Sequence, residues 1–248
     1  MTVRRRLDVE LVRRGLVASR AAAQAAIDER VVTVAGALAE KPSRLVAPSE
    51  PVELLTPRRF VGRGGEKLEG ALDHFSIDVT DRRALDAGAS TGGFTDCLLQ
   101  RGAREVIAVD VGHGQLDARL RADPRVVVLE RCNARHLRPE SIGGRVEIVV
   151  ADLSFISLTA VVPALVGVAE RGATLVLLVK PQFEAGRAAV SRGRGVVRDA
   201  EVHLAVQQRV ADALVAAGAT IMGWMQSPLR GADGNVEFFV HARTSDRP

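Results

Sequence analysis

The stretch that decides the fold is Asp86-Ala-Gly-Ala-Ser-Thr-Gly-Gly-Phe-Thr-Asp96, a glycine-rich turn between an apolar run and a helix-like run. Gly88 permits a tight turn where the first run ends, and Gly92 and Gly93 let a ligand approach the backbone closely. Asp110 ends the next apolar run, about 20 residues on, where an acidic side chain binds the hydroxyls of a ribose. The pattern predicts a nucleotide-containing cofactor at the first turn of an α/β sheet.

Strand-like and helix-like runs alternate around this turn, which is typical of a doubly wound, mostly parallel sheet. The strand-like runs are Ala84–Asp86, Val106–Asp110, Val126–Leu129, Val146–Ala151, Thr174–Val179, Thr220–Met225 and Val236–Val240. The helix-like runs are Thr95–Arg101, Leu116–Arg121, Leu158–Ala169 and Glu201–Ala217. No helix separates the last two strands, so we expect a seven-stranded Rossmann-like sheet with an antiparallel last strand. Its ligand loops gather at the carboxyl ends of the parallel strands.

The first part of the chain indicates a second, smaller α+β domain. Leu7, Leu11 and Val12 have helical spacing, and Ser19 is a suitable N-cap for a second helix. Short strands follow, and Pro57 with the glycines at 62, 64 and 65 then interrupts the pattern. We therefore expect a small domain at residues 1–57, a linker at 58–65 and the α/β domain at 66–248.

Positive charge is concentrated in three segments, residues 1–30, 56–70 and 182–198, in a chain whose net charge is +4. Such clustering is the footprint of a protein that binds a phosphate backbone, although a solvated basic surface is the alternative. The arginines that we expect to contact nucleic acid are Arg4, Arg6, Arg14, Arg20, Arg59 and Arg63. Aromatic residues make up only 3% of the chain, which argues against a stacking platform for single strands.

Several classes of protein are disfavoured by composition. No apolar run approaches the roughly 20 residues that span a bilayer, and no secretion signal opens the chain. Cys97 and Cys132 lack zinc spacing, and the histidines are scattered, so we expect no metal site. The prediction is a cytoplasmic protein with reduced thiols, and the sequence leaves its oligomeric state open.

Two details favour S-adenosylmethionine over NAD as the cofactor. The carboxylate of Asp86 suits the ammonium of a methionine group and would repel a pyrophosphate, and Ser90 replaces the middle glycine of the dinucleotide pattern. The expected cofactor-binding residues are Asp86, Gly88, Ala89, Ser90, Gly92, Gly93, Phe94, Asp110, Val111, Asn133 and Asp152. An NAD-type oxidoreductase remains the alternative at this point.

Four charged residues are expected to converge beside the cofactor: Lys67, Asp152, Lys180 and Glu237. Asp152 and Lys180 each follow a parallel strand, and an antiparallel last strand would begin with Glu237 at the same edge. Such a group suits methyl transfer to a ribose hydroxyl, which must be oriented and deprotonated. Lys180, one of only three lysines, is the expected base. Lys67 as a surface lysine and Glu237 as a solvent-facing strand residue remain the alternatives.

Longer blocks carry a resemblance to a known family. Asp86–Asp96, ADLSFISL at 151–158, VKPQF at 179–183 and GNVE at 234–237 resemble the signature blocks of the TlyA family, often called hemolysin A. Residues 4–55 resemble the RNA-binding module first described in ribosomal protein S-four, except that Asp28-Glu-Arg30 stands where the module usually has a glycine before the strand.

The resemblance implies a ribose 2′-O-methyltransferase that uses S-adenosylmethionine on a cytidine of small- or large-subunit ribosomal RNA. It also implies the Lys-Asp-Lys-Glu tetrad of the related FtsJ class, at Lys67, Asp152, Lys180 and Glu237. Two further hypotheses remain: a membrane-active hemolysin-type protein, and a non-catalytic RNA-binding factor in ribosome assembly. The Gln182–Arg198 loop is expected either to close over RNA or to be a disordered insertion.

Overall fold

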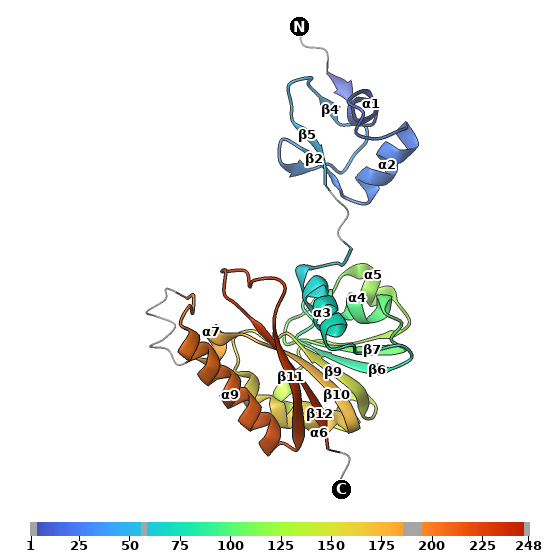
Figure 1. The fold of residues 1–248 in the computed structure, drawn as a ribbon. Coiled ribbons are helices and arrows are strands. Elements are labelled where there is room, and N and C mark those ends of the chain that lie inside the picture. Colours follow the sequence, from blue (N-terminus) through green and yellow to red (C-terminus); the bar gives the residue numbers. More distant parts are fainter. Residues whose placement is uncertain (1–3, 56–58, 186–194, 246–248) are drawn as a thin grey trace. The chain divides into compact units, whose positions relative to one another are not determined.

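The computed structural model describes residues 4–55, 59–185 and 195–245. The chain forms two compact units, Met1–Arg59 and Phe60–Pro248 (Figure 1). The expected domain boundary at residue 57 lies outside the described residues, and so do residues 186–194 of the Gln182–Arg198 loop.

The N-terminal unit is a small α+β module. Its elements are β1 (Arg5–Arg6), α1 (Leu7–Arg13), α2 (Arg20–Asp28), β2 (Val32–Val34), β3 (Ala37–Leu38), β4 (Leu45–Val46) and β5 (Val52–Leu54). β2 lies between β3 and β5 in an antiparallel sheet, and β1 pairs with β4. The expected N-cap is present, because Ser19 Oγ accepts a hydrogen bond from the Ala22 N–H at 3.1 Å. Leu7, Leu11 and Ile27 form the centre of its thin core.

The turn before β2 keeps its shape without the usual glycine. Arg30 adopts a left-handed backbone with φ of 58°, a conformation that glycine adopts more easily. Its N–H bonds the Ile27 carbonyl at 3.0 Å, and the Val31 N–H bonds the Ala26 carbonyl at 3.0 Å. The departure at Asp28-Glu-Arg30 therefore changes the residue that makes the turn and leaves the turn itself in place.

The C-terminal unit is built on a seven-stranded sheet in the order β11-β12-β10-β9-β6-β7-β8. The strands are β6 (Arg83–Ala87), β7 (Glu105–Val109), β8 (Val126–Leu129), β9 (Val146–Ala151), β10 (Ala169–Val179), β11 (Ala219–Gln226) and β12 (Phe238–Thr244). The strands β10, β9, β6, β7 and β8 are parallel, and β12 is antiparallel to both β10 and β11. The predicted sheet and its antiparallel last strand are confirmed.

Helices cover both faces of this sheet (Figure 1). On one face α3 (Arg63–His74), α4 (Gly93–Gln100) and α5 (Ala118–Ala122) bury Leu68, Leu98 and Leu120. On the other face α6 (Val162–Val168) and α9 (Ala200–Ala216) bury Leu165 and Val206. Shorter helical turns are η1 (Ala134–His136), η2 (Pro139–Ile142), η3 (Leu158–Ala160) and α7 (Pro181–Glu184). Among the described residues, none of the helices has the length and apolar character needed to cross a bilayer.

One predicted helical run is divided in two, and one helix begins inside the expected linker. The run Leu158–Ala169 is divided into η3 and α6, because Pro163 has no N–H to donate and is tolerated only in the first turn of a new helix. The helix α3 begins at Arg63, inside the linker expected at 58–65, so that Gly64 and Gly65 are helical. Gly65 is required there, because a Cβ atom would lie 2.3 Å from the buried ring of Phe60.

The Gly65→Ala variant is therefore expected to destabilise the C-terminal unit by about 1–3 kcal/mol through overpacking. Gly167→Ala is the matched control: it is also helical and has nothing within 4 Å of the added Cβ. That change should be neutral or stabilise by up to about 1 kcal/mol. Urea unfolding followed by Trp224, the only tryptophan, reports this unit alone; equal effects of the two changes would contradict the packing.

Candidate active site

Strand register brings three of the predicted catalytic residues to one edge of the sheet. Val179 pairs with Phe238 across the antiparallel β10–β12 ladder. Lys180, which follows Val179, and Glu237, which precedes Phe238, are therefore the next opposed positions. Asp152 follows β9 and reaches the same edge, where its N–H bonds the Ala87 carbonyl at the end of β6 at 3.0 Å.

The four predicted catalytic residues form two ion pairs. Lys180 Nζ lies 2.5 Å from Asp152 Oδ1 and donates to Ser154 Oγ at 2.9 Å. Lys67, in the second turn of α3, donates from Nζ to Glu237 Oε2 at 2.6 Å. The second pair is the more enclosed, with side chains 9% and 2% exposed against 11% and 22% for Lys180 and Asp152. Because a buried charge requires a partner, the two ion pairs explain how all four charged side chains can be largely buried. Their catalytic roles stay a prediction.

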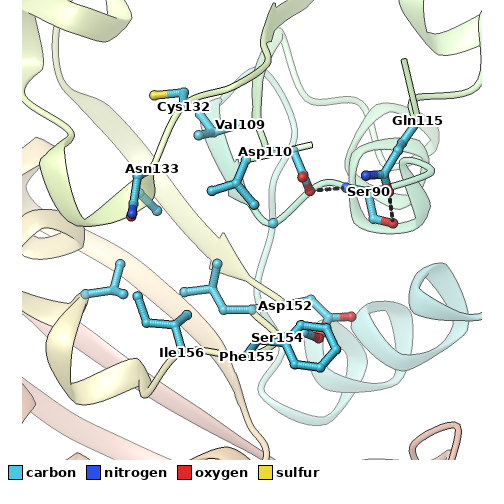
Figure 2. A pocket seen from close by; sticks show the side chains of 15 residues that line it. Ser90, Val109, Asp110, Gln115, Cys132, Asn133, Asp152, Ser154, Phe155 and Ile156 are labelled. Carbon is cyan, nitrogen blue, oxygen red and sulfur yellow. Dashed lines mark hydrogen bonds between the residues drawn. The ribbon is translucent and has the colours of Figure 1, made fainter. Parts of the chain in front are cut away.

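A cavity of about 550 Å³ opens at this edge, between the loops that follow β6, β7, β8 and β9. In Figure 2 Ser90, Asp110 and Gln115 lie on one side of it, and Asp152, Ser154 and Phe155 lie on the other. Val109, Val111, Cys132, Asn133 and Ile156 complete most of the remaining wall. A volume of this size and a mainly apolar wall with a few polar groups are typical of a small-molecule site.

The polar groups fit S-adenosylmethionine. Asp110 accepts from the Gly112 N–H at 2.7 Å and from the Ser90 N–H at 2.8 Å (Figure 2). Each carboxylate oxygen keeps a lone pair that can accept from a ribose hydroxyl. Asn133 uses Oδ1 to cap η1 through the Arg135 N–H at 3.0 Å, which leaves its amide NH₂ for the adenosine end.

The predicted loop glycines are needed for backbone shape. Gly88 and Gly92 have φ of 88° and 100°, in the left-handed region. A Cβ on Gly88 would lie 2.6 Å from the Asp152 carbonyl oxygen, and one on Gly92 would lie 2.2 Å from Leu120. Because these two positions admit no side chain, the chain can turn tightly between the end of β6 and the start of α4.

Asp86 occupies a different place from the one expected. It was expected to face the ammonium of the cofactor, but it is fully buried below the loop and does not line the cavity. Thr95 Oγ1 donates to its Oδ2 at 2.6 Å, and among the described residues its Oδ1 has no hydrogen-bond partner. Burial, reinforced by the charges of Asp152 and Asp110, raises the pKa of Asp86 to about 7. Any effect on a cofactor is therefore exerted through the loop and through its charge.

A smaller hollow of about 190 Å³ adjoins the cavity. The two share Gly88, Ser90, Asp152 and Ser154, and the smaller one is also lined by Lys180 and by the first residues of α3 and α4, including Gly64 and Phe94. The predicted residues Ala89 and Gly93 belong to this hollow, and Val111 stands at the rim of the larger cavity. Asp152 therefore lines both spaces, and Lys180 lines the smaller one beside it.

Sequence reasoning missed several residues of the site. Gln115 and Ser154 line the cavity, but no motif marks a lone glutamine or serine. Glu184 is 7% exposed and accepts from Ser157 Oγ at 2.6 Å and from the Leu158 N–H at 2.5 Å, so it ties the loop after β9 to the turn after Lys180. Asn235 is fully buried, accepts from the Val197 N–H at 2.9 Å and donates to the Gly195 carbonyl at 3.0 Å. Glu184 directly follows the VKPQF block and Asn235 lies within the GNVE block, which was the available signal.

The six predicted nucleic-acid arginines have different surroundings. Arg4, Arg6 and Arg20 have side chains 59%, 47% and 64% exposed, and Arg59 is exposed as well. Arg14 is only 19% exposed, and its guanidinium is used within the N-terminal unit. It donates to the carbonyls of Glu50, Ala47 and Pro48 and to the Glu10 carboxylate, so its place is structural. Arg63 donates to the Arg230 carbonyl at 2.7 Å at the mouth of the site.

The sheet order, the loop glycines and the cavity define an S-adenosylmethionine-dependent methyltransferase. Comparison with known proteins gives the family. The model of the FtsJ-like methyltransferase family matches residues 60–244, and that of the S4 domain matches residues 5–52. The chain belongs to the FtsJ-like methyltransferase family, with an S4 domain before the methyltransferase domain.

Individual relatives cover nearly the whole chain. The 16S/23S rRNA (cytidine-2′-O)-methyltransferase TlyA of Mycobacterium tuberculosis is 53% identical over 98% of this chain and 91% of its own length. Hemolysin A of Brachyspira hyodysenteriae is 38% identical over 95% of this chain and 98% of its own length. A solved structure of a hemolysin-named protein from Streptococcus thermophilus is 39% identical, with a TM-score of 0.75 over 100% of this chain and 91% of that one. The resemblance to the TlyA family is confirmed.

Asp86→Asn tests the electrostatics of the loop. The folded pKa of about 7 exceeds the ordinary 3.8, so the folded state holds the proton more tightly and stability falls as pH rises from about 4 to about 7. Asparagine can still accept from Thr95 and removes this penalty. The variant should gain about 1–3 kcal/mol at pH 8 and little at pH 4 in urea unfolding, and it should bind S-adenosylmethionine more weakly by calorimetry. An equal gain at both pH values would contradict the burial effect.

Proposed function

We propose that this protein transfers the methyl group of S-adenosylmethionine to the ribose 2′-hydroxyl of a cytidine in ribosomal RNA. The observation that carries the proposal is the Lys180–Asp152 pair, at 2.5 Å, on the border between the cofactor cavity and the adjoining hollow. The M. tuberculosis relative at 53% identity, whose name states this reaction, supports the choice of substrate.

The chain's own residues supply orientation and proton transfer. When bound, the cofactor supplies an electrophilic methyl group on a sulfonium. In the proposed mechanism the Lys180 amine is the general base: it accepts the proton of the 2′-hydroxyl as the methyl group passes to the ribose oxygen. Asp152 and Ser154 hold the Lys180 amine in place, and Asp152 balances the charge once the proton has moved.

The second pair acts at longer range in this mechanism. Glu237 accepts a hydrogen bond from Lys67 Nζ and so fixes the position of this ammonium group inside the protein. Its charge lies at the same sheet edge as Lys180 and so favours the alkoxide that develops on the ribose oxygen.

An exposed aromatic residue fits a displaced base. Phe155 is 93% exposed, although Leu153 and Ile156 in the same cavity wall are half-buried, and its backbone has a φ of 63°, which is strained for phenylalanine. Its ring lies 5.3 Å from that of Phe183, between the centroids, and Phe183 lies below Lys180. A base turned out of its stack can lie on this pair while its ribose faces Lys180.

Ribosomal RNA as substrate also gives the S4 domain and the basic residues their use. The exposed arginines of residues 4–20 supply charge for the RNA backbone. A protein that acts on ribosomal RNA works in the cytoplasm, which agrees with the expectation from the sequence.

The direct test incubates purified protein with S-adenosylmethionine and bacterial ribosomal subunits that lack this modification. We expect new 2′-O-methylcytidine in ribosomal RNA, located by nuclease digestion and mass spectrometry. RNA binding without methyl transfer would favour the assembly-factor hypothesis. Methyl transfer to a base atom would overturn the ribose assignment. Dye release from liposomes without any RNA methylation would favour the membrane-active hypothesis.

Lys180→Arg tests the proposed base, because arginine keeps the positive charge but does not give up its proton. We expect methylation to fall by about 100-fold or more while S-adenosylmethionine affinity is kept. Lys41→Arg, at the remaining lysine outside the methyltransferase unit, is the matched control and should retain full activity. Methylation by Lys180→Arg at the wild-type rate would exclude Lys180 as the base.

A further inference from the structure

Two clusters in the N-terminal unit have the same composition, one buried acid and two arginines. In the first, Asp8 is 4% exposed and holds Arg6 and Arg20. In the second, Glu10 is fully buried and holds Arg13 and Arg14. Each cluster carries one more positive charge than negative, so charge alone does not show which of them is better suited to bind a phosphate.

Geometry separates the two clusters. In the Glu10 cluster Arg14 is turned inward, and its remaining N–H groups are spent on the carbonyls of Ala47, Pro48 and Glu50. In the Asp8 cluster Arg6 donates Nε and Nη2 to the two carboxylate oxygens at 3.1 Å each, and Arg20 donates Nη2 to Oδ2 at 2.7 Å. Within the part of the chain that the structure describes, no further hydrogen bond is made by either guanidinium of the Asp8 cluster.

Asp8 brings together side chains from two elements. Arg6 ends β1 and Arg20 begins α2, fourteen residues apart along the chain. Both guanidinium groups are about half exposed or more, at 47% and 64%, while the carboxylate between them is buried. The hydrogen bonds from the arginines lower the pKa of Asp8 to about 2, so it remains a carboxylate at neutral pH.

We propose that Asp8 is a positioning residue that holds Arg6 and Arg20 as a two-armed site for one phosphodiester group of RNA. The single carboxylate neutralises one guanidinium and leaves one positive charge, which a phosphate matches. Holding both side chains in advance also removes the rotamer entropy that two free arginines would lose on binding. The inference rests on the proposed function in taking RNA as the ligand.

The sign of the effect makes Asp8→Asn a sharp test. Removing an acid raises the net charge above +4, and long-range electrostatics alone would then strengthen RNA binding. The proposal predicts the opposite: about tenfold weaker binding of deproteinised ribosomal RNA at about 0.15 M salt, and a log K against log salt slope smaller by about one. Glu10→Gln is the matched control: it removes the same charge from the cluster in which backbone carbonyls already hold Arg14 inward, and it should leave the slope unchanged.

The measurement is filter binding of labelled ribosomal RNA to the full-length chain over a range of salt concentrations. Circular dichroism melting shows whether each variant folds. If Asp8→Asn does not fold, variants of the two exposed arginines, Arg6 and Arg20, test the proposed site instead. Arg6→Ala and Arg20→Ala should each weaken binding, and the double variant should lose less than the sum because both arms hold one phosphate.

Each outcome bears on the inference. Equal or tighter binding by folded Asp8→Asn, or strictly additive losses at Arg6 and Arg20, overturns the positioning role and leaves the proposed methyltransferase function standing. A wild-type chain that binds no ribosomal RNA removes the ligand and overturns both. Weaker binding by Asp8→Asn with an unchanged Glu10→Gln supports the two-armed site.

Discussion

The antiparallel pairing of β12 with β10 is the constraint on which the active site depends. It sets Glu237 opposite Lys180, beside the end of β9 where Asp152 stands. β12 is seven residues long, so a parallel β12 would carry Glu237 about 20 Å away to the other edge of the sheet. Lys67 would then lose the carboxylate that matches it, and a buried ammonium without a partner is not tolerated.

The two ion pairs cost more to bury than a packed apolar cluster of the same size. Buried pairs are often no more stable than hydrophobic replacements, although the removal of one partner is strongly destabilising. The same holds for Asp86, whose charge is disfavoured by its surroundings. The two ion pairs and the buried Asp86 lie at one sheet edge, and stability alone does not favour any of them. A catalytic role for this edge explains them best.

Much of the fold followed from the pattern of the sequence. Apolar runs and the absence of a helix before β12 predicted the sheet, and strand ends predicted which residues share an edge. The burial of individual side chains was harder to predict. A strand that is buried on both faces, like β6 with its Asp86, has no alternation to show which way a side chain points. The fate of Arg14 depends on carbonyls more than 30 residues away in the chain, which helical spacing does not reveal.

The sequence likewise did not predict which lysine pairs with which acid in the active site. Two lysines and two acids at one edge allow two pairings, and only the packing of α3 against β12 selects Lys67 with Glu237. Gln115, Glu184 and Asn235 were missed because their roles consist of hydrogen bonds to distant loops. Functional positions held by tertiary contacts leave little local signal, whereas glycine turns and strand-end acids leave a strong one.

A crystal structure of the protein with S-adenosylhomocysteine tests the central claim most directly. The account places the ribose of this product against Asp110 and its sulfur at the border formed by Gly88, Asp152 and Ser154, facing Lys180. A complex with the sulfur turned toward Cys132 and Asn133, away from both lysines, would contradict it.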